Sequence, residues 1–154
     1  MKKNNRKLHG YQTTNRAKHN LKIHLIFVCK YRKKLIYGEL DDFLKIIISD
    51  IEKKSDFDII EVETDKDHIH FSKRVIALQP FHFTRMIQYI PRVAISSIVN
   101  RLKSITTYHL WQNYRPFLKQ HFWKENTFWT DGYFVCSVGE ASPETIRKYI
   151  QNQG

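Results

Sequence analysis

The chain of 154 residues contains only two cysteines, five glycines and four prolines. Cys29 and Cys136 cannot build a disulfide framework and lack the spacing of metal ligands, so we expect a protein of the reducing cytoplasm. Sparse glycine and proline, together with the absence of any internal repeat, exclude low-complexity linkers and repeat architectures. The longest apolar run, Leu25 to Cys29, is far too short to span a bilayer. No apolar stretch follows the basic N-terminus, so we expect no secretion signal.

Acidic residues are absent from residues 1–38, which contain eleven lysines and arginines. Because residues 39–154 carry fifteen residues of each sign, the first segment accounts for the whole net charge of +11. Residues 68–124 also lack acids and contain nine basic residues. Separation of charge on this scale favours a polyanion, such as nucleic acid, as the partner. The alternative is a basic protein whose charges are merely solvated.

A folded chain is expected, because 42% hydrophobic and 14% aromatic residues can bury a substantial core. We divide it into a basic N-terminal arm, residues 1–20, and a single domain, residues 21–154. Hydrophobic periodicity in the domain predicts strands at 21–30, 57–64, 67–75 and 133–138, and helices at 38–54, 80–105 (kinked by a proline) and from 143 onward. This β-α-β-β-α-β order with a C-terminal helix predicts an α+β fold built on a ferredoxin-like, RRM-like antiparallel sheet. Such sheets often bind single-stranded nucleic acid.

The segment Asp67-His68-Ile69-His70 lies in the third predicted strand. Side chains two residues apart on a strand share a face, so His68 and His70 stand side by side while Ile69 points the other way. Two neighbouring imidazoles are able to hold one divalent metal ion. The same pattern on an exposed strand is more often only solvent-facing, so a metal role depends on the rest of the site.

The last predicted helix begins with Ser142 at the N-cap and Pro143 at the first helical position. Tyr149 and Gln153 are four residues apart on it, so they lie one above the other, on the packed side. A tyrosine on an amphipathic helix is most often a packing residue. Next to a metal ion, its hydroxyl is a candidate nucleophile for attack on a phosphate.

Four motifs occur in order along the chain. They are Val28-Cys29-Lys30-Tyr31-Arg32; Thr64-Asp65-Lys66-Asp67-His68-Ile69-His70; Phe128-Trp129 through Tyr133-Phe134-Val135 with Ser137-Val138-Gly139-Glu140; and the closing Lys148-Tyr149-Ile150-Gln151-Asn152-Gln153. With these motifs the chain resembles, from about Leu21 to Gln153, the single-tyrosine HUH transposases (TnpA) of insertion sequence 200/605 type elements.

The resemblance implies a metal-dependent DNA transposase. In it, His68, His70 and Gln153 hold Mg²⁺ or Mn²⁺, and Tyr149 attacks the scissile phosphate to give a 5′-phosphotyrosine bond and a free 3′-hydroxyl. It also implies hairpins in single-stranded DNA at the element ends as the partner, and a homodimer in which the tyrosine helix often completes the partner's site in trans. Two imidazoles and an amide are softer ligands than magnesium prefers, which favours manganese in vitro.

Basic side chains near these motifs are the candidate DNA contacts. They are Lys30, Arg32, Lys33, Lys34, Lys73, Arg74, Arg101 and Lys103.

Two other functions stay open: a non-catalytic domain that binds single-stranded nucleic acid with the same sheet, and a metal-dependent hydrolase without a covalent intermediate. Only the combination of two histidines, the tyrosine and the glutamine distinguishes the transposase from a domain that merely binds nucleic acid. Binding alone does not require these four residues.

Overall fold

The structure is a computed structural model that describes residues 7–8, 11–14, 17–19, 21–59, 62–71, 87–89, 94–137 and 143–152. Its elements in chain order are β1 (Lys7–Leu8), β2 (Tyr11–Thr14), β3 (Ala17–His19), β4 (Leu21–Val28), η1 (Lys30–Arg32), α1 (Gly38–Lys53), β5 (Phe57–Ile59), β6 (Val62–Asp65), β7 (His68–Phe71), β8 (Ile87–Tyr89), α2 (Ile95–Asn113), α3 (Arg115–Lys119), β9 (Phe134–Ser137) and α4 (Pro143–Gln151). Strands β1, β2 and β3 pair with one another in a small antiparallel sheet. The sequence indicated no periodicity in this segment, and its boundary with the domain stays a prediction.

Strand β4 is the centre of the larger sheet. It pairs with β9 on one side and with β7 and β8 on the other, always antiparallel. Because β7 pairs in turn with β6, the order β9-β4-β7-β6 makes a four-stranded antiparallel sheet, and β5 joins it through β8. Every residue from Ile23 to Val28 is buried, as expected for a strand covered on both faces.

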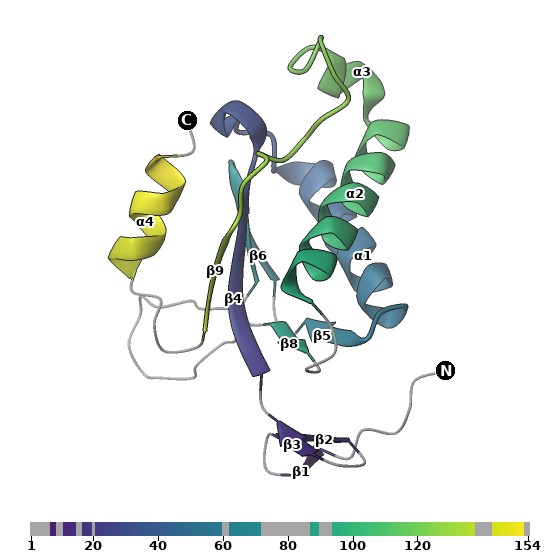
Figure 1. Cartoon of the computed structure of the whole chain (residues 1–154). Helices are drawn as coiled ribbons and strands as arrows, with labels where there is room; N and C mark the ends of the chain where they lie inside the picture. Colours follow the sequence, from purple (N-terminus) through teal and green to yellow (C-terminus); the bar gives the residue numbers. More distant parts are fainter. Residues whose placement is uncertain are drawn as a thin grey trace.

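Helices α1 and α2 cover one face of the sheet, and α4 lies on the other (Figure 1). The main core fills the side of α1 and α2, where Phe27 and Ile69 of the sheet are buried. Leu40, Leu44 and Ile47 of α1 recur at three- and four-residue spacing, which puts them on one buried stripe. The predicted α+β class and antiparallel sheet are therefore confirmed. Within the described ranges, no helix combines the length and apolar character that a membrane crossing requires.

The helix predicted over residues 80–105 is wrong at residues 87–89, and residues 80–86 and 90–93 lie outside the described residues. Residues Ile87–Tyr89 form strand β8, which pairs with β4 and β5, and α2 begins only at Ile95. Pro91 gives the physical reason, since it cannot donate a backbone hydrogen bond and disfavours helical geometry in the residue before it. Likewise, the strand predicted at 57–64 is divided into β5 and β6.

Lys103 on α2 is held by the loop that leads into β9. Its Nζ donates hydrogen bonds to the carbonyl oxygens of Thr130 at 2.7 Å, Asp131 at 3.2 Å and Gly132 at 2.7 Å. The ammonium also lies 5.2 Å from the ring centroid of Phe27. Burial lowers the pKa of Lys103 to about 8, but three carbonyl acceptors favour the charged form, so we infer an ammonium at neutral pH. Lys103 therefore joins the helical layer to the loop before β9.

Replacing Lys103 with methionine is expected to lower the free energy of unfolding by about 2 kcal/mol, because hydrogen bonds from a charged donor contribute roughly 1.5–3 kcal/mol. Methionine keeps the apolar stem and removes the three donated bonds. Lys119→Met, at the exposed end of α3, is the matched control. Urea denaturation midpoints measure the effect, and equal midpoints for the two variants would contradict a structural role of Lys103.

Candidate active site

The pairing of β4 with β7 places both histidines on the face of the sheet that α4 covers. Val28 pairs with His68, and Ile26 pairs with His70. Residues directly opposite each other on antiparallel strands share a face. Ile26 and Val28 are buried in a small cluster with α4, whereas Ile69 belongs to the core on the opposite face. The predicted alternation along the histidine strand is therefore confirmed for residues 68–71.

Carboxylates stand beside these histidines. On β6, Asp65 pairs with His68 and Glu63 pairs with His70, so their side chains share the same face. One ligand atom from each of Asp65, Asp67 and His68 lies within 4.8 Å of the others. Imidazole together with carboxylate is a donor set that suits manganese, and the carboxylates add the oxygen ligands that magnesium prefers. This set of donors is therefore suited to a divalent cation, and both manganese and magnesium fit it.

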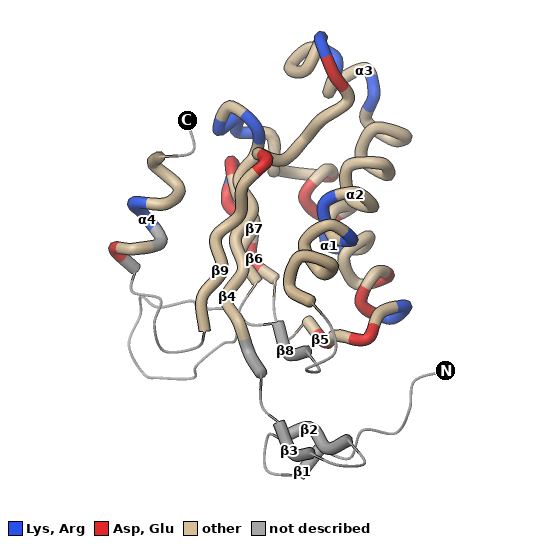
Figure 2. Tube along the Cα trace, viewed as in Figure 1, with Lys and Arg blue, Asp and Glu red and all other residues tan. Residues whose placement is uncertain are grey.

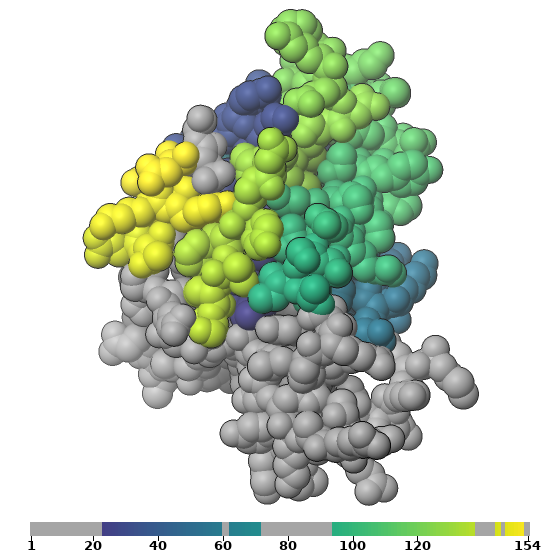
Figure 3. Space-filling view, in the orientation of Figure 1, coloured from purple at the N-terminus to yellow at the C-terminus, as the bar shows by residue number. Residues whose placement is uncertain are grey.

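Tyr149 packs onto this face from α4. Its ring centroid lies 5.4 Å from that of Phe134 on β9, and it contacts the cluster of Ile26 and Val28. Figures 1 and 3 show α4 alongside β9. The hydroxyl is buried and has no hydrogen-bond partner among the residues that the structure describes. Burial raises the pKa of Tyr149 to about 12. The hydroxyl is therefore protonated at neutral pH, and a reaction at its oxygen requires a proton acceptor.

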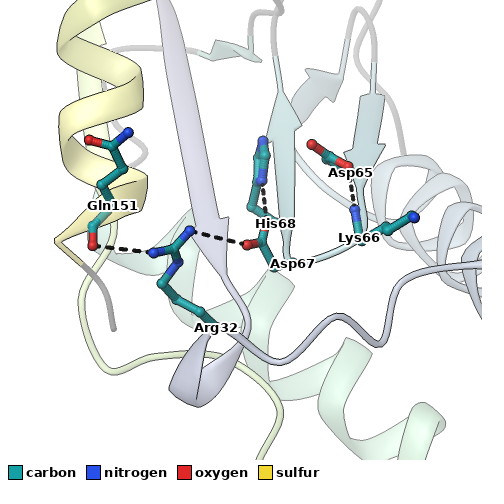
Figure 4. A network of polar contacts seen from close by, with 6 residues as sticks. All are labelled: Arg32, Asp65, Lys66, Asp67, His68 and Gln151. Atoms are coloured by element: carbon teal, nitrogen blue, oxygen red, sulfur yellow. Dashed lines mark hydrogen bonds and ion pairs between the residues drawn. The ribbon is translucent and has the colours of Figure 1, made fainter.

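A network of polar contacts links α4 to the histidine strand (Figure 4). Arg32 donates from Nη1 to the carbonyl oxygen of Gln151 at 3.4 Å, and its Nη2 lies 3.7 Å from Oδ2 of Asp67. The other carboxylate oxygen of Asp67 is 2.8 Å from Nδ1 of His68. An ionised carboxylate only accepts hydrogen bonds, so Nδ1 carries the proton and the lone pair of His68 is on Nε2.

Basic residues gather on the turn after β4, close to α4 (Figure 2). They are Lys30, Arg32, Lys33 and Lys34. Lys30 forms an ion pair with Glu125 at 2.7 Å, and the hydrogen bond to this carboxylate raises the pKa of Lys30. Arg101 lies on α2, on the other side of the sheet, where its guanidinium donates to the carbonyl of Lys54 at 3.3 Å. The turn after β4 therefore lies at the candidate site, whereas Arg101 and Lys103 lie on α2, on the opposite face of the sheet.

Three of the predicted site residues lie outside the described residues. They are Gln153, Lys73 and Arg74. For these residues, the sequence predictions stand as they were made.

Sequence reasoning missed the contribution of the acids. The sequence predicts Asp65 in the tight connection before the histidine strand and Asp67 as the first residue of that strand, yet both stand against His68. The signal available in the sequence was an aspartate immediately before the first histidine. His24 also lies close to this site. It is buried on β4, and its ring centroid lies 6.3 Å from that of His70.

Comparison with known proteins gives a consistent result. The pattern of the family described as "Transposase IS200 like" matches residues 17–80 and 74–153. The ISDra2 transposase TnpA of Deinococcus radiodurans is 30% identical over 135 residues, which cover 88% of this chain and 85% of that protein. The transposase for insertion sequence element IS200 of Salmonella typhimurium is 26% identical over 87% of this chain and 77% of its own length. A crystal structure of a candidate transposase from Deinococcus radiodurans R1 superposes with a TM-score of 0.70 at 28% identity, covering 86% of this chain and 90% of the other.

Proposed function

This chain belongs to the IS200-like transposase family, and we propose that it cuts and rejoins single-stranded DNA at the ends of an insertion sequence through a covalent tyrosine intermediate. One observation carries the proposal. Tyr149 packs against Ile26 and Val28, and these two residues are the direct strand partners of His70 and His68. A candidate nucleophile and a candidate metal site therefore share one face of the sheet.

The proposed reaction is a phosphoryl transfer to Tyr149. The tyrosine oxygen forms a bond to the phosphorus while the bond from phosphorus to the 3′-oxygen breaks, leaving a 5′-phosphotyrosine and a free 3′-hydroxyl. The proton lost by the tyrosine is balanced by the proton that the 3′-oxygen gains. Because the new bond is also a phosphodiester, the reverse attack by a 3′-hydroxyl rejoins strands without ATP.

His68, His70 and Gln153 would hold Mg²⁺ or Mn²⁺, with Asp65 close enough to add an oxygen ligand. When bound, the ion polarises the scissile phosphate and stabilises the charge that develops on it. The protein's own residues supply the orientation. The strand fixes the two histidines on one face, and α4 brings the tyrosine to that face.

The proposed partner is a DNA hairpin next to the unpaired strand that is cut. The turn of residues 30–34 lies next to α4 and supplies positive charge for phosphates close to Tyr149. The basic residues 1–20 add sequence-independent affinity that falls with salt through counterion release. We further propose a homodimer, in which the tyrosine helix is able to complete the partner's site in trans, acting at the nucleoid.

A covalent-trapping assay tests the proposal. The protein is mixed with labelled single-stranded DNA from the ends of its own element, with Mn²⁺ or Mg²⁺, and run on a denaturing gel beside a sample with chelator. A metal-dependent adduct of protein and DNA supports the covalent mechanism. Hairpin binding without any adduct would favour the non-catalytic binding domain. Cleavage without an adduct would favour the hydrolase.

The pH dependence of adduct formation follows from the buried hydroxyl. Between about pH 7.5 and 9.5 we expect roughly tenfold faster adduct formation per pH unit, because the tyrosinate fraction grows tenfold per unit below the pKa. The raised pKa of about 12, against 10.0 for a free tyrosine, has a separate consequence for stability. Because the pKa is higher in the folded chain, the protonated hydroxyl of Tyr149 contributes to the free energy of unfolding. Below pH 10 the hydroxyl is protonated in both the folded and the unfolded chain, so this contribution is fully present. It is lost as the pH rises from 10 toward 12.

Rapid-quench measurement of adduct formation, at saturating metal and DNA, checks the first of these expectations. Replacement of tyrosine by a fluorinated tyrosine of lower pKa should move the profile to lower pH. A rate that is flat over the whole range would mean that loss of the phenolic proton does not limit the reaction.

A further inference from the structure

Arg32 makes contacts that the reaction described above does not use. Its guanidinium bridges two segments that are far apart in the sequence, the end of α4 and the turn before β7. Toward α4, it reaches the carbonyl oxygen of Gln151, which belongs to the last turn of the helix. Carbonyls in a last helical turn lack partners within the helix and carry partial negative charge, so a cation is favourable there. Toward β7, it faces the carboxylate of Asp67, whose side chain is only 11% exposed.

The backbone around Arg32 has an unusual conformation. Tyr31 and Arg32 have φ values of 61° and 50°, in the left-handed region that side chains rarely adopt. Such a conformation persists where the surroundings hold it in place, and it is concentrated at functional sites. Here the turn is tied to the connection before β7, because the N–H of Cys29 donates to the carbonyl of Asp67 at 2.8 Å and the N–H of Ile36 donates to that of Lys66 at 2.9 Å. The turn therefore places the Arg32 side chain between α4 and Asp67.

We propose that Arg32 and Asp67 are positioning residues. They fix His68, the candidate metal ligand, and α4, the helix that carries Tyr149, in position relative to each other. Asp67 accepts the hydrogen bond from Nδ1 of His68, which fixes the ring and leaves Nε2 for the metal. Arg32 neutralises the carboxylate of Asp67 and holds the carboxyl end of α4, the helix that carries Tyr149. The role in metal binding rests on the proposed function.

The arginine side chain is suited to this role. Its planar guanidinium presents donors in two directions, so that one nitrogen reaches Gln151 and another faces Asp67. A lysine has a single ammonium group at the end of its chain and cannot make both contacts in the same geometry. The sequence indicated only a phosphate contact for Arg32. The structure instead engages two of its nitrogens in contacts with other parts of the protein.

The first test measures the attachment of α4 in the absence of DNA and metal. In Arg32→Gln, we expect the backbone amides of the last turn of α4 to exchange with deuterium about two- to fivefold faster, as loss of a cation from a helix end predicts. The matched control is Lys34→Gln, which removes one charge from an exposed position on the same turn. Equal exchange in both variants would overturn the role of Arg32. Arg32→Lys keeps the cation but loses the second contact, so its exchange should fall between those of the wild type and Arg32→Gln.

The second test measures the ring of His68 and its metal. In Asp67→Asn we expect the affinity for Mn²⁺, measured by electron paramagnetic resonance, to fall about 10- to 100-fold, the usual effect of losing a partner of a ligand histidine. The ¹⁵N shifts of His68 in the metal-free protein should also report a loss of the Nδ1–H tautomer, which a purely structural change elsewhere would not cause. Asp50→Asn, an exposed position on α1, is the control. Unchanged shifts and affinity would overturn the role of Asp67.

Failure of this inference is distinguishable from failure of the proposed function. Exchange and ¹⁵N shifts are measured without DNA or cleavage, so they test the positioning contacts alone. If these measurements agree with expectation while the wild type never forms an adduct, then the contacts are real and the transposition mechanism is wrong. If the adduct forms normally in Arg32→Gln and Asp67→Asn, then the mechanism stands and the positioning role is wrong.

Discussion

Replacing Tyr149 with phenylalanine is expected to abolish the covalent adduct while hairpin affinity stays nearly unchanged. Only one oxygen atom is lost, and the ring that packs against Phe134 and the cluster of Ile26 and Val28 is kept. Loss of the nucleophile in an enzyme that works through a covalent intermediate costs on the order of 10⁶-fold in turnover. The adduct should therefore fall below detection.

The same variant is expected to be at least as stable as the wild type. The hydroxyl of Tyr149 is buried without a hydrogen-bond partner among the described residues. A buried polar group of this kind costs about 1 kcal/mol or more, and phenylalanine removes that cost. If the variant is more stable than the wild type and cannot form the adduct, then the hydroxyl serves the reaction and not the packing of the protein.

Denaturing gels measure the adduct, gel shifts measure hairpin affinity, and thermal denaturation measures stability. Tyr108→Phe is the control, because Tyr108 is 60% exposed on α2, in the layer on the other face of the sheet. Persistence of the adduct in Tyr149→Phe would eliminate Tyr149 as the nucleophile. Loss of the adduct in the control as well would point to a general effect of tyrosine substitution.

Replacing His68 or His70 with alanine is expected to lower metal-dependent cleavage by at least about 100-fold, with a much smaller effect on DNA affinity. The two side chains share one face and stand opposite the carboxylates of Asp65 and Glu63. Loss of a partner of a ligand histidine already costs 10- to 100-fold, so loss of the ligand itself should cost more. Because each alanine leaves its neighbouring ligand in place, partial recovery at high Mn²⁺ concentration is expected.

The control for these variants is His109→Ala, at an exposed position on α2. His70 is buried, and its truncation leaves a cavity, so His70→Gln serves as a second variant that keeps the volume and a polar atom. Gel shifts in chelator separate the two possible roles. If hairpin affinity without metal fell as far as cleavage does, the histidines would be structural residues and not metal ligands.

The sequence by itself determined the family, the α+β class and the local pattern of the site. Alternation along residues 68–71 depends only on the two-residue period of a strand, so it was predictable from this segment alone. The helix at 38–54 was predicted with nearly its observed bounds, because its apolar stripe has the helical period. The order of the motifs gave the family, which the comparisons confirm.

Only the tertiary structure decided which residues stand against one another. The sequence predicts helix where the chain forms strand β8, because the pairing of β8 with β4 and β5 joins segments that are distant in the sequence and leaves no local period. The contacts of Asp67 with His68 and Arg32, and those of Lys103 with the loop before β9, depend on strand register and on turns, which side-chain periodicity does not encode. Residue type therefore predicted the candidate nucleophile and ligands, whereas the groups that hold them in place emerged from long-range packing.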